Sequence, residues 1–174
     1  MFGLGGKVAL VTGAAGSLGS AIATVYAEAG ADLLLVDIDA EGLRSLAKLL
    51  ERPGQRILTH VGSVGDIAQI AEIFACLDRE FGRVDLLMNV AGSAKLGSPE
   101  KIDLADVEYS VHNLITARFF CCQQAGKRML KAGKGSIISI CSVTGFAANG
   151  RNHMPYSMSI GPPPEKWSAL NYVF

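Results

Sequence analysis

The chain has 174 residues, of which 49% are hydrophobic and 18% charged, and its 16 Lys and Arg residues balance 16 Asp and Glu residues. This composition is typical of a single globular domain and is too apolar for a disordered chain. Because the net charge is zero and no basic cluster occurs, we expect neither nucleic acid nor an anionic membrane as a partner.

The amino-terminal segment and the cysteines indicate the cellular compartment of the chain. Residues 1–7 contain no apolar stretch of signal-peptide length, and no apolar run is long enough to span a bilayer. The four cysteines show neither CxxC nor metal-ligand spacing; they are Cys76, Cys121, Cys122 and Cys141. We therefore expect reduced core thiols, Cys141 included, no metal site and a cytoplasmic location.

Apolar runs of strand length alternate with segments of helical periodicity. The predicted strands cover residues 8–11, 33–36, 57–61, 84–90 and 136–141. The predicted helices cover residues 18–29, 40–51, 67–81 and 103–130, the last with a break near Asn113. The apolar positions of the first helix are Leu18, Ile22, Val25 and Ala29.

This alternation predicts an α/β fold. Strands joined by helices form right-handed crossovers and therefore a parallel sheet covered by helices on both faces. We expect a three-layer, doubly wound sheet with strand order 3-2-1-4-5, with ligands at the carboxyl ends of the strands.

A glycine-rich loop at residues 12–19 connects the first strand to the first helix. Gly13, Gly16 and Gly19 would permit a tight turn and a close approach of the backbone to a pyrophosphate. Ser17 and Leu18 would offer backbone N–H groups at the helix N-terminus. An ordinary strand–helix turn is the alternative, but the position after a buried strand favours dinucleotide binding, and no Gly-Lys-Ser/Thr follows as in a P-loop.

Asp37, followed by Ile38, stands at the end of the second predicted strand. A carboxylate at this point accepts hydrogen bonds from the adenosine ribose and repels a 2′-phosphate. No Lys or Arg in the glycine loop or directly after Asp37 would neutralise such a phosphate. The alternative is a helix N-cap, formed by Asp37 or Asp39. We expect NAD as the cofactor, in preference to NADP.

Four further features follow the glycine loop along the chain: Asn89-Val90-Ala91-Gly92, Asn113, Ser142 and Tyr156. With Thr12-Gly13, they resemble the short-chain dehydrogenase/reductase family over about residues 4–159. The resemblance implies a Rossmann-type fold that lacks the family's last strands. It also implies hydride transfer between NAD(H) and an alcohol or ketone substrate.

The resemblance assigns roles to individual residues. It implies that Asn113 holds a proton-relay water, that Ser142 bonds the substrate oxygen and that Tyr156 is the acid/base. Further residues implied at the cofactor are Thr12, Asn89, Ala91, Gly92, Ser63 and Val64. Ser63 stands where the family usually has an Asp that contacts the adenine.

The family pattern Tyr-x-x-x-Lys is broken here, because Ile160 takes the place of the lysine and three prolines follow Gly161. A lysine would stabilise the phenolate and orient the nicotinamide ribose, so we expect weak activity or none. We predict a dinucleotide-binding domain at residues 1–159 and a divergent, Pro-rich tail at 160–174, as in a truncated relative. The alternatives are a non-catalytic NAD(H)-binding fragment or subunit, and a truncated product without stable function.

The predicted helix over residues 113–130 is apolar on nearly all sides. In the family this helix packs against a partner subunit, so the resemblance implies a homo- or hetero-oligomer. The fifth strand, at 136–141, would form an exposed edge of the sheet, which favours association with another chain.

Overall fold

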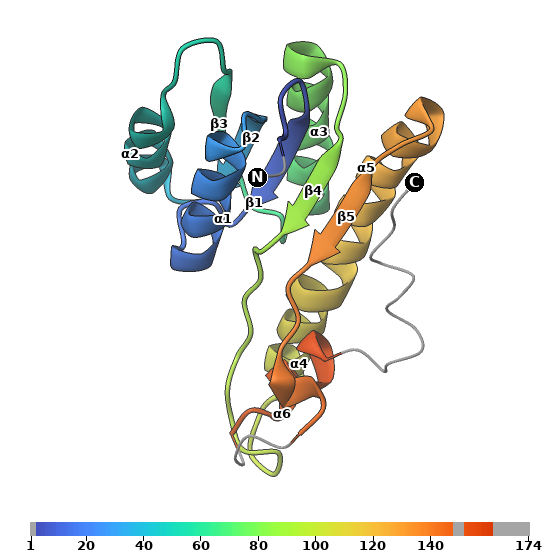
Figure 1. The fold of residues 1–174 in the computed structure, drawn as a ribbon. Helices are drawn as coiled ribbons and strands as arrows, with labels where there is room; N and C mark the ends of the chain where they lie inside the picture. Colours follow the sequence, from blue (N-terminus) through green and yellow to red (C-terminus); the bar gives the residue numbers. More distant parts are fainter. Residues whose placement is uncertain (1–2, 148–151, 162–174) are drawn as a thin grey trace.

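The structure is a computed structural model that describes residues 3–147 and 152–161. It has one parallel sheet of five strands in the order β3-β2-β1-β4-β5, as predicted (Figure 1). The strands are β1 (Val8–Thr12), β2 (Asp32–Asp37), β3 (Ile57–Val61), β4 (Leu86–Asn89) and β5 (Ser136–Ser139). The α-helices are α1 (Ser17–Glu28), α2 (Ala40–Leu50), α3 (Ile67–Phe81), α4 (Leu104–Val111), α5 (Ala117–Ala132) and α6 (Met154–Ile160).

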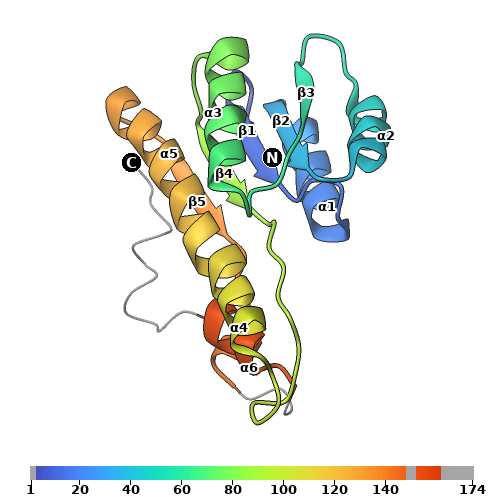
Figure 2. The same cartoon turned by 180° about the vertical axis from the view of Figure 1, so that it is seen from behind.

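Helices cover both faces of the sheet, α1 and α2 on one and α3 and α5 on the other (Figure 2). Successive side chains of a strand point to opposite faces, so β1 contributes to two cores. Val8 and Leu10 pack with α3 and α5, whereas Ala9 and Val11 pack with α1 and α2. All five residues of β1 are buried, which explains why the run from Val8 to Val11 is continuously apolar.

The first helix forms where predicted, and Ile22 of the predicted apolar face packs partly buried against the core, but other residues form the fully buried face. Leu18 and Val25 are 46% and 60% exposed. The buried residues of α1 are instead Gly19, Ala23 and Ala27, which follow one another at intervals of four. Small side chains let α1 lie close to the sheet, and this close packing outweighs the burial of the larger apolar residues.

The break predicted near Asn113 is a turn of π-helix, η1 (His112–Thr116), between α4 and α5. A π turn widens the helix locally, and such turns are frequent at functional sites. The expected apolar surface of α5 is only partly exposed, because Cys121, Cys122, Ala125 and Met129 are buried in the core. Phe119 and Leu130 remain 50% and 65% exposed.

In the part of the chain that the structure describes, β5 is an edge strand, as predicted. Ile137 is buried beneath α5, whereas Ile138 on the other face is 40% exposed. The strand ends at Ser139, two residues earlier than predicted. The prediction that Cys141 lies in the core is therefore wrong: it lies beyond the strand and is exposed.

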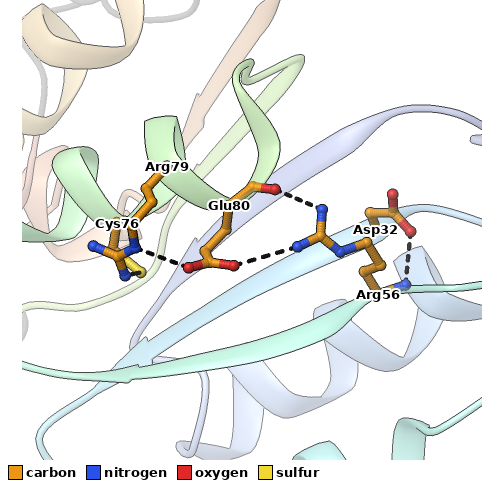
Figure 3. Close-up of polar contacts among 5 residues, drawn as sticks. All are labelled: Asp32, Arg56, Cys76, Arg79 and Glu80. Carbon is orange, nitrogen blue, oxygen red and sulfur yellow. Dashed lines mark hydrogen bonds and ion pairs between the residues drawn. The ribbon is translucent and has the colours of Figure 1, made fainter.

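A polar network ties the end of α3 to the amino ends of β2 and β3 (Figure 3). The Arg56 backbone N–H donates to Asp32 Oδ1 at 2.8 Å, and its guanidinium donates to the Glu80 carbonyl at 2.5 Å. Arg79 Nε donates to Glu80 Oε1 at 2.9 Å, and Arg79 Nη2 contacts Cys76 Sγ at 3.4 Å. These contacts lie at the amino ends of the strands, whereas ligands are expected at the carboxyl ends.

Asp85, just before β4, also forms stabilising contacts at the amino ends of the strands. It is 6% exposed, accepts the Val8 N–H at 2.9 Å and pairs with Arg83 and Lys7. Burial alone would raise the pKa of this carboxyl, but the hydrogen bonds from Arg83 and the Val8 N–H hold it below its usual value. The ionised form of Asp85 therefore stabilises the fold.

Asp85→Asn is expected to lower the free energy of unfolding at pH 7 by about 1–3 kcal/mol, because it removes charge-assisted hydrogen bonds. A depressed folded-state pKa gives stability that is present above the unfolded pKa of about 3.9 and is lost as pH falls through the folded value. Urea unfolding at pH 7 and below pH 4 checks this, and the difference from the parent should shrink at the lower pH. Asp103→Asn, at an N-cap without a side-chain hydrogen bond, is the control. A difference that persists undiminished in acid would contradict this role of Asp85.

Candidate functional site

A cavity of about 470 Å³ opens at the carboxyl ends of β1, β2 and β4. Its walls are the loop between β1 and α1, the ends of β2 and β3, the loop after β4, and the junction of α4 with η1. This is the edge of a doubly wound sheet at which ligands bind, because the strand order reverses between β1 and β4.

The glycine loop forms one wall through Gly13 and residues 16–19. Gly13 has φ of +67°, and a Cβ there would lie 2.8 Å from the Ala91 backbone N. A Cβ on Gly19 would lie 2.0 Å from the Gly13 carbonyl oxygen. Glycine is therefore required at both positions for the loop, α1 and the end of β4 to approach this closely.

The N-terminus of α1 has the features of an anion-binding site. No side chain caps this helix, whereas Asp39 and Asp66 cap α2 and α3. No acidic residue lies in the first turn of α1, and residues 17–19 line the cavity. The first backbone N–H groups and the positive end of the helix dipole can therefore serve a phosphate.

Asp37 lines the cavity beside Ile38, at the end of β2. Its Oδ2 accepts the Ala15 N–H at 3.0 Å, which ties the glycine loop to β2, and its Oδ1 accepts the Asp39 N–H at 3.1 Å. The N-cap of α2 is Asp39, whose Oδ1 accepts the N–H groups of residues 41 and 42. The alternative role of Asp37 as helix cap is thus taken by Asp39.

The remaining wall residues carry little charge. Ser63 and Val64 line the cavity after β3, and Ala91 and Gly92 line it after β4. Among the described residues that line the cavity, Asp37 is the one with a charged side chain and none is Lys or Arg. The Ser63 hydroxyl accepts the Gly65 N–H at 3.1 Å, so it shapes its own loop.

Two predicted cofactor residues lie beneath the cavity and do not line it. Thr12 is 1% exposed, and its Oγ1 accepts the N–H groups of Val90 and Ala91 at 3.2 and 3.3 Å. Asn89 is also 1% exposed, and its Nδ2 donates to Cys122 Sγ and Ser139 Oγ, both at 3.3 Å. Thr12 thus fixes the loop after β4, which does line the cavity, whereas Asn89 ties the end of β4 to α5 and β5.

Asn113 lines the cavity from η1. Its Nδ2 donates to the Tyr109 carbonyl at 2.9 Å, four residues earlier in the helix. The neighbouring His112 donates from Nε2 to the Gly65 carbonyl at 2.7 Å and so joins η1 to the loop after β3. Nothing in the sequence distinguished this contact of His112 from that of a surface histidine.

Ser142 and Tyr156 do not line this cavity, but they belong to neighbouring elements. Ser142 begins a turn of 3-10 helix, η2 (Val143–Gly145), and its Oγ accepts the Thr144 hydroxyl at 2.9 Å. The helix with Tyr156, α6, packs against η2, α4 and η1 (Figure 1). A Cβ on Gly145 would lie 1.8 Å from the Gly161 Cα, so the two backbones are in direct contact. The elements that carry the three candidate catalytic residues thus converge around α6.

The sequence analysis missed Arg118, which is 4% exposed near the start of α5. Its Nη1 donates to the Ile140 carbonyl at 2.5 Å, just before Ser142. The available signal was a single charged residue within the mostly apolar run from Leu114 to Cys122. A charged side chain buried to this extent is rare unless it is paired.

Ile160 ends α6 and is 5% exposed, so the position of the family lysine is a core position here. Gly161 has φ −85° and ψ 135°, the extended conformation favoured by a residue that precedes proline. The division of the chain after residue 159 stays a prediction, since residues 162–174 lie outside the described part.

Ile160→Lys is expected to lower the free energy of unfolding by about 2–4 kcal/mol, because it removes buried apolar surface and buries an ammonium group. Ile160→Met, which keeps volume and polarity, should cost less than about 1.5 kcal/mol. Denaturant unfolding of both variants measures the difference. Equal stability of the two variants would mean that the ammonium finds a partner around α6.

The buried Cys121 thiol is neutral, and the described residues hold neither a group of metal ligands nor a helix that could span a bilayer. Burial raises the pKa of the Cys121 thiol to about 12, so it stays protonated at neutral pH. Over residues 3–147 and 152–161, no three His, Cys, Asp or Glu side chains are grouped as metal ligands. No helix within these ranges has the length and apolar character needed to cross a bilayer.

Comparisons with known proteins agree with the fold. The chain is 42% identical to D-threitol dehydrogenase of Mycolicibacterium smegmatis over 91% of this chain and 60% of that protein. It is 33% identical to gluconate 5-dehydrogenase of Gluconobacter oxydans over 82% of this chain and 56% of that protein. The chain therefore spans about 60% of the length of such relatives.

Solved structures match equally well. Levodione reductase superposes with a TM-score of 0.83 at 30% identity, over 91% of this chain and 62% of that one. A short-chain type dehydrogenase/reductase from Mycobacterium marinum gives a TM-score of 0.86 at 27% identity, over 91% and 63%.

A family model described as short chain dehydrogenase matches residues 7–159. The match begins just before β1 and ends within α6, so it includes the glycine loop and the segment around Tyr156. This range covers most of the chain and includes all five strands of the sheet, which have the predicted order. The chain belongs to the short-chain dehydrogenase family.

Proposed function

We propose that the chain binds NAD(H), in preference to NADP(H), as part of an oxidoreductase that interconverts an alcohol and a ketone. The observation that carries this proposal is the pairing of an uncapped α1 N-terminus with Asp37 across one cavity. The first suits a pyrophosphate, and the second suits a ribose diol.

The preference for NAD rests on charge. Asp37 is the one charged side chain among the described residues of the cavity wall. A 2′-phosphate beside this carboxylate would meet repulsion without a compensating Lys or Arg. Both oxygens of Asp37 accept a backbone N–H, and a carboxylate keeps further lone pairs for ribose hydroxyls.

The close contacts of the loop fit a dinucleotide. A Cβ on Gly16 would meet only the Gly13 carbonyl, at 3.4 Å, so the inner side of the loop stays open to a ligand. Bound nicotinamide would exchange a hydride with the substrate carbon. On the side of the chain, Tyr156 would exchange a proton with the substrate oxygen, Ser142 would donate a hydrogen bond to it, and Asn113 would hold the water that relays the proton.

A second candidate is an NAD(H)-binding subunit without turnover of its own, which associates with intact relatives. Two observations favour it: Ile160 is buried where a lysine is needed, and α5 exposes Phe119 and Leu130. Helix 113–130 would then form the contact, as a homo- or hetero-oligomer.

Two titrations followed by one assay test the proposal. NADH and NADPH are titrated into the chain by cofactor fluorescence, and a panel of secondary alcohols and ketones is then assayed with NAD⁺ or NADH. Saturable NADH binding that is tighter than NADPH binding is expected. Turnover would support the oxidoreductase, binding without turnover the subunit, and absence of NADH binding would overturn both.

A further inference from the structure

We propose that His112 is a positioning residue for the adenosine end of the cofactor, acting through the backbone carbonyl of Gly65. This inference rests on the proposed function, because it concerns how the same cavity holds NAD(H). His112 does not line the cavity itself. It holds the loop at residues 62–65, which does line the cavity, against η1.

The first argument is that one hydrogen bond joins two walls of the cavity. The loop at residues 62–65 forms the wall that follows β3, and Tyr109 and Asn113 form another from α4 and η1. His112 Nε2 donates to the Gly65 carbonyl at 2.7 Å, between residues 47 positions apart in the chain. A carbonyl oxygen only accepts hydrogen bonds, so the imidazole carries its proton on Nε2. The position of the loop relative to η1 therefore depends on this side chain.

The second argument is that the other hydrogen bonds of this loop run to different elements. The Gly62 N–H donates to the Asp37 carbonyl at 2.9 Å, at the end of β2. The Ser63 N–H donates to Gln69 Oε1 at 2.8 Å, in α3. Among the residues that the structure describes, the bond from His112 is the one hydrogen bond that ties the loop to α4 or η1. Without it, hydrogen bonds would hold the loop to β2 and α3 alone.

The third argument is the close packing of η1 on Gly65. A Cβ on Gly65 would lie 2.6 Å from Asn113 Oδ1 and 3.3 Å from Ser63 Oγ. The Asn113 side chain is itself held, because its Nδ2 donates to the Tyr109 carbonyl at 2.9 Å. His112 and Asn113 are neighbours in the π turn, and both lie against Gly65. The loop and the π turn thus fit together at this glycine.

The loop belongs to the adenosine end of the cavity because of its connection to Asp37. The proposed function places the ribose diol of the adenosine at the Asp37 carboxylate. The Gly62 N–H is bonded to the carbonyl of the same residue, so the loop begins beside this ribose site. The adenine is attached to the same ribose and would therefore meet the loop.

The fourth argument is what the loop can offer an adenine ring. None of residues 62–65 has a charged side chain, and the Ser63 hydroxyl accepts the Gly65 N–H at 3.1 Å. The loop therefore presents backbone groups and the Val64 side chain to the cavity, and Ile38 lines the same cavity after β2. Ile38 is 72% exposed, and a flat aromatic ring would cover it. Apolar contacts of this kind depend on shape, and hence on where the backbone of the loop lies.

The test is the binding of AMP and NADH to variants at position 112. His112→Phe keeps a ring and removes the N–H donor, whereas His112→Gln carries an amide N–H at a similar reach. We expect the Phe variant to bind both ligands about threefold to tenfold more weakly, by the same factor, because one hydrogen bond that positions the loop is lost. The Gln variant should lie closer to the parent. NADH binding is followed by cofactor fluorescence and AMP binding by displacement of NADH; His112→Ala is the second variant without the donor, should the Phe variant not fold.

His60→Phe is the matched control, because it makes the same exchange at a histidine beside the same loop. Its Cδ2 would lie 3.3 Å from a Cβ on Gly62. The His60 side chain does not line the cavity, and within the described residues it has no hydrogen-bond partner. The affinities of this variant for AMP and NADH should therefore stay those of the parent.

Unchanged AMP affinity in His112→Phe would overturn the inference, as would equal losses in the Phe and Gln variants. A much larger loss for NADH than for AMP would also contradict it, because the effect would then extend beyond the adenosine end. Titration of the parent reports on the proposed function separately. A parent that binds neither ligand overturns the proposed function and this inference with it, whereas a parent that binds both, with unaffected variants, overturns the inference alone.

Discussion

Gly19→Ala is expected to weaken NADH binding by about a hundredfold, which corresponds to about 2.7 kcal/mol. The new methyl group would lie 2.0 Å from the Gly13 carbonyl oxygen and 2.9 Å from the Ala14 Cα. Because both atoms belong to the backbone, the first turn of α1 must move away from the loop. The N–H groups that would hold the pyrophosphate move with it, and the displaced packing lowers stability by about 1–3 kcal/mol.

Gly126→Ala is the matched control, because it makes the same chemical change in a helix. A Cβ on Gly126 in α5 would meet nothing within 4 Å. There the substitution should stabilise the chain by about 0.5–1 kcal/mol and leave NADH binding unchanged. Calorimetric unfolding and NADH fluorescence on both variants give the comparison. Undiminished NADH affinity in Gly19→Ala would show that the cofactor does not use this loop.

Asp37→Ala is expected to weaken NADH binding by about tenfold or more and to reduce the discrimination against NADPH. A hydrogen bond to a charged group contributes about 1.5–3 kcal/mol, and Asp37 would offer such bonds to the ribose. The variant also loses the contact between Asp37 and the Ala15 N–H, so the glycine loop loosens. The ratio of the NADPH and NADH dissociation constants is the quantity to measure.

Asp39→Ala separates this role from that of a nearby carboxylate. Asp39 caps α2 and does not line the cavity, so its loss should lower stability by about 1 kcal/mol. The cofactor ratio should stay that of the parent. A parent-like ratio in Asp37→Ala as well would remove the charge argument for NAD.

The sheet was predictable because its signals are local. The continuous apolar runs of β1 and β2 indicate strands buried on both faces, and the handedness of crossovers then leaves few strand orders. The packing face of α1 was not predictable, since Leu18 and Val25 are the larger apolar residues. The choice of Gly19, Ala23 and Ala27 depends on how closely the helix approaches the sheet.

Some parts of the candidate site could likewise be predicted from the sequence, and others could not. The glycine loop and Asp37 are adjacent to the ends of predicted strands, so their positions at the cavity followed from the fold. Thr12 and Asn89 do not line the cavity because Thr12 bonds the backbone after β4 and Asn89 bonds α5 and β5, partners that spacing in the sequence does not reveal. Arg118 was missed because its hydrogen-bond partner, the Ile140 carbonyl just after β5, is distant in the sequence.

The central claim is that NAD(H) binds at the glycine loop and Asp37. Titration of NAD⁺ into the isotopically labelled chain, followed by backbone amide resonances, tests it most directly. We expect saturable shifts at Gly13, residues 16–19, Ile38 and Val64, with little change at Arg52 and Arg56 beside a second cavity next to α2. Absence of saturable shifts, or shifts gathered at Arg52 and Arg56, would contradict the claim.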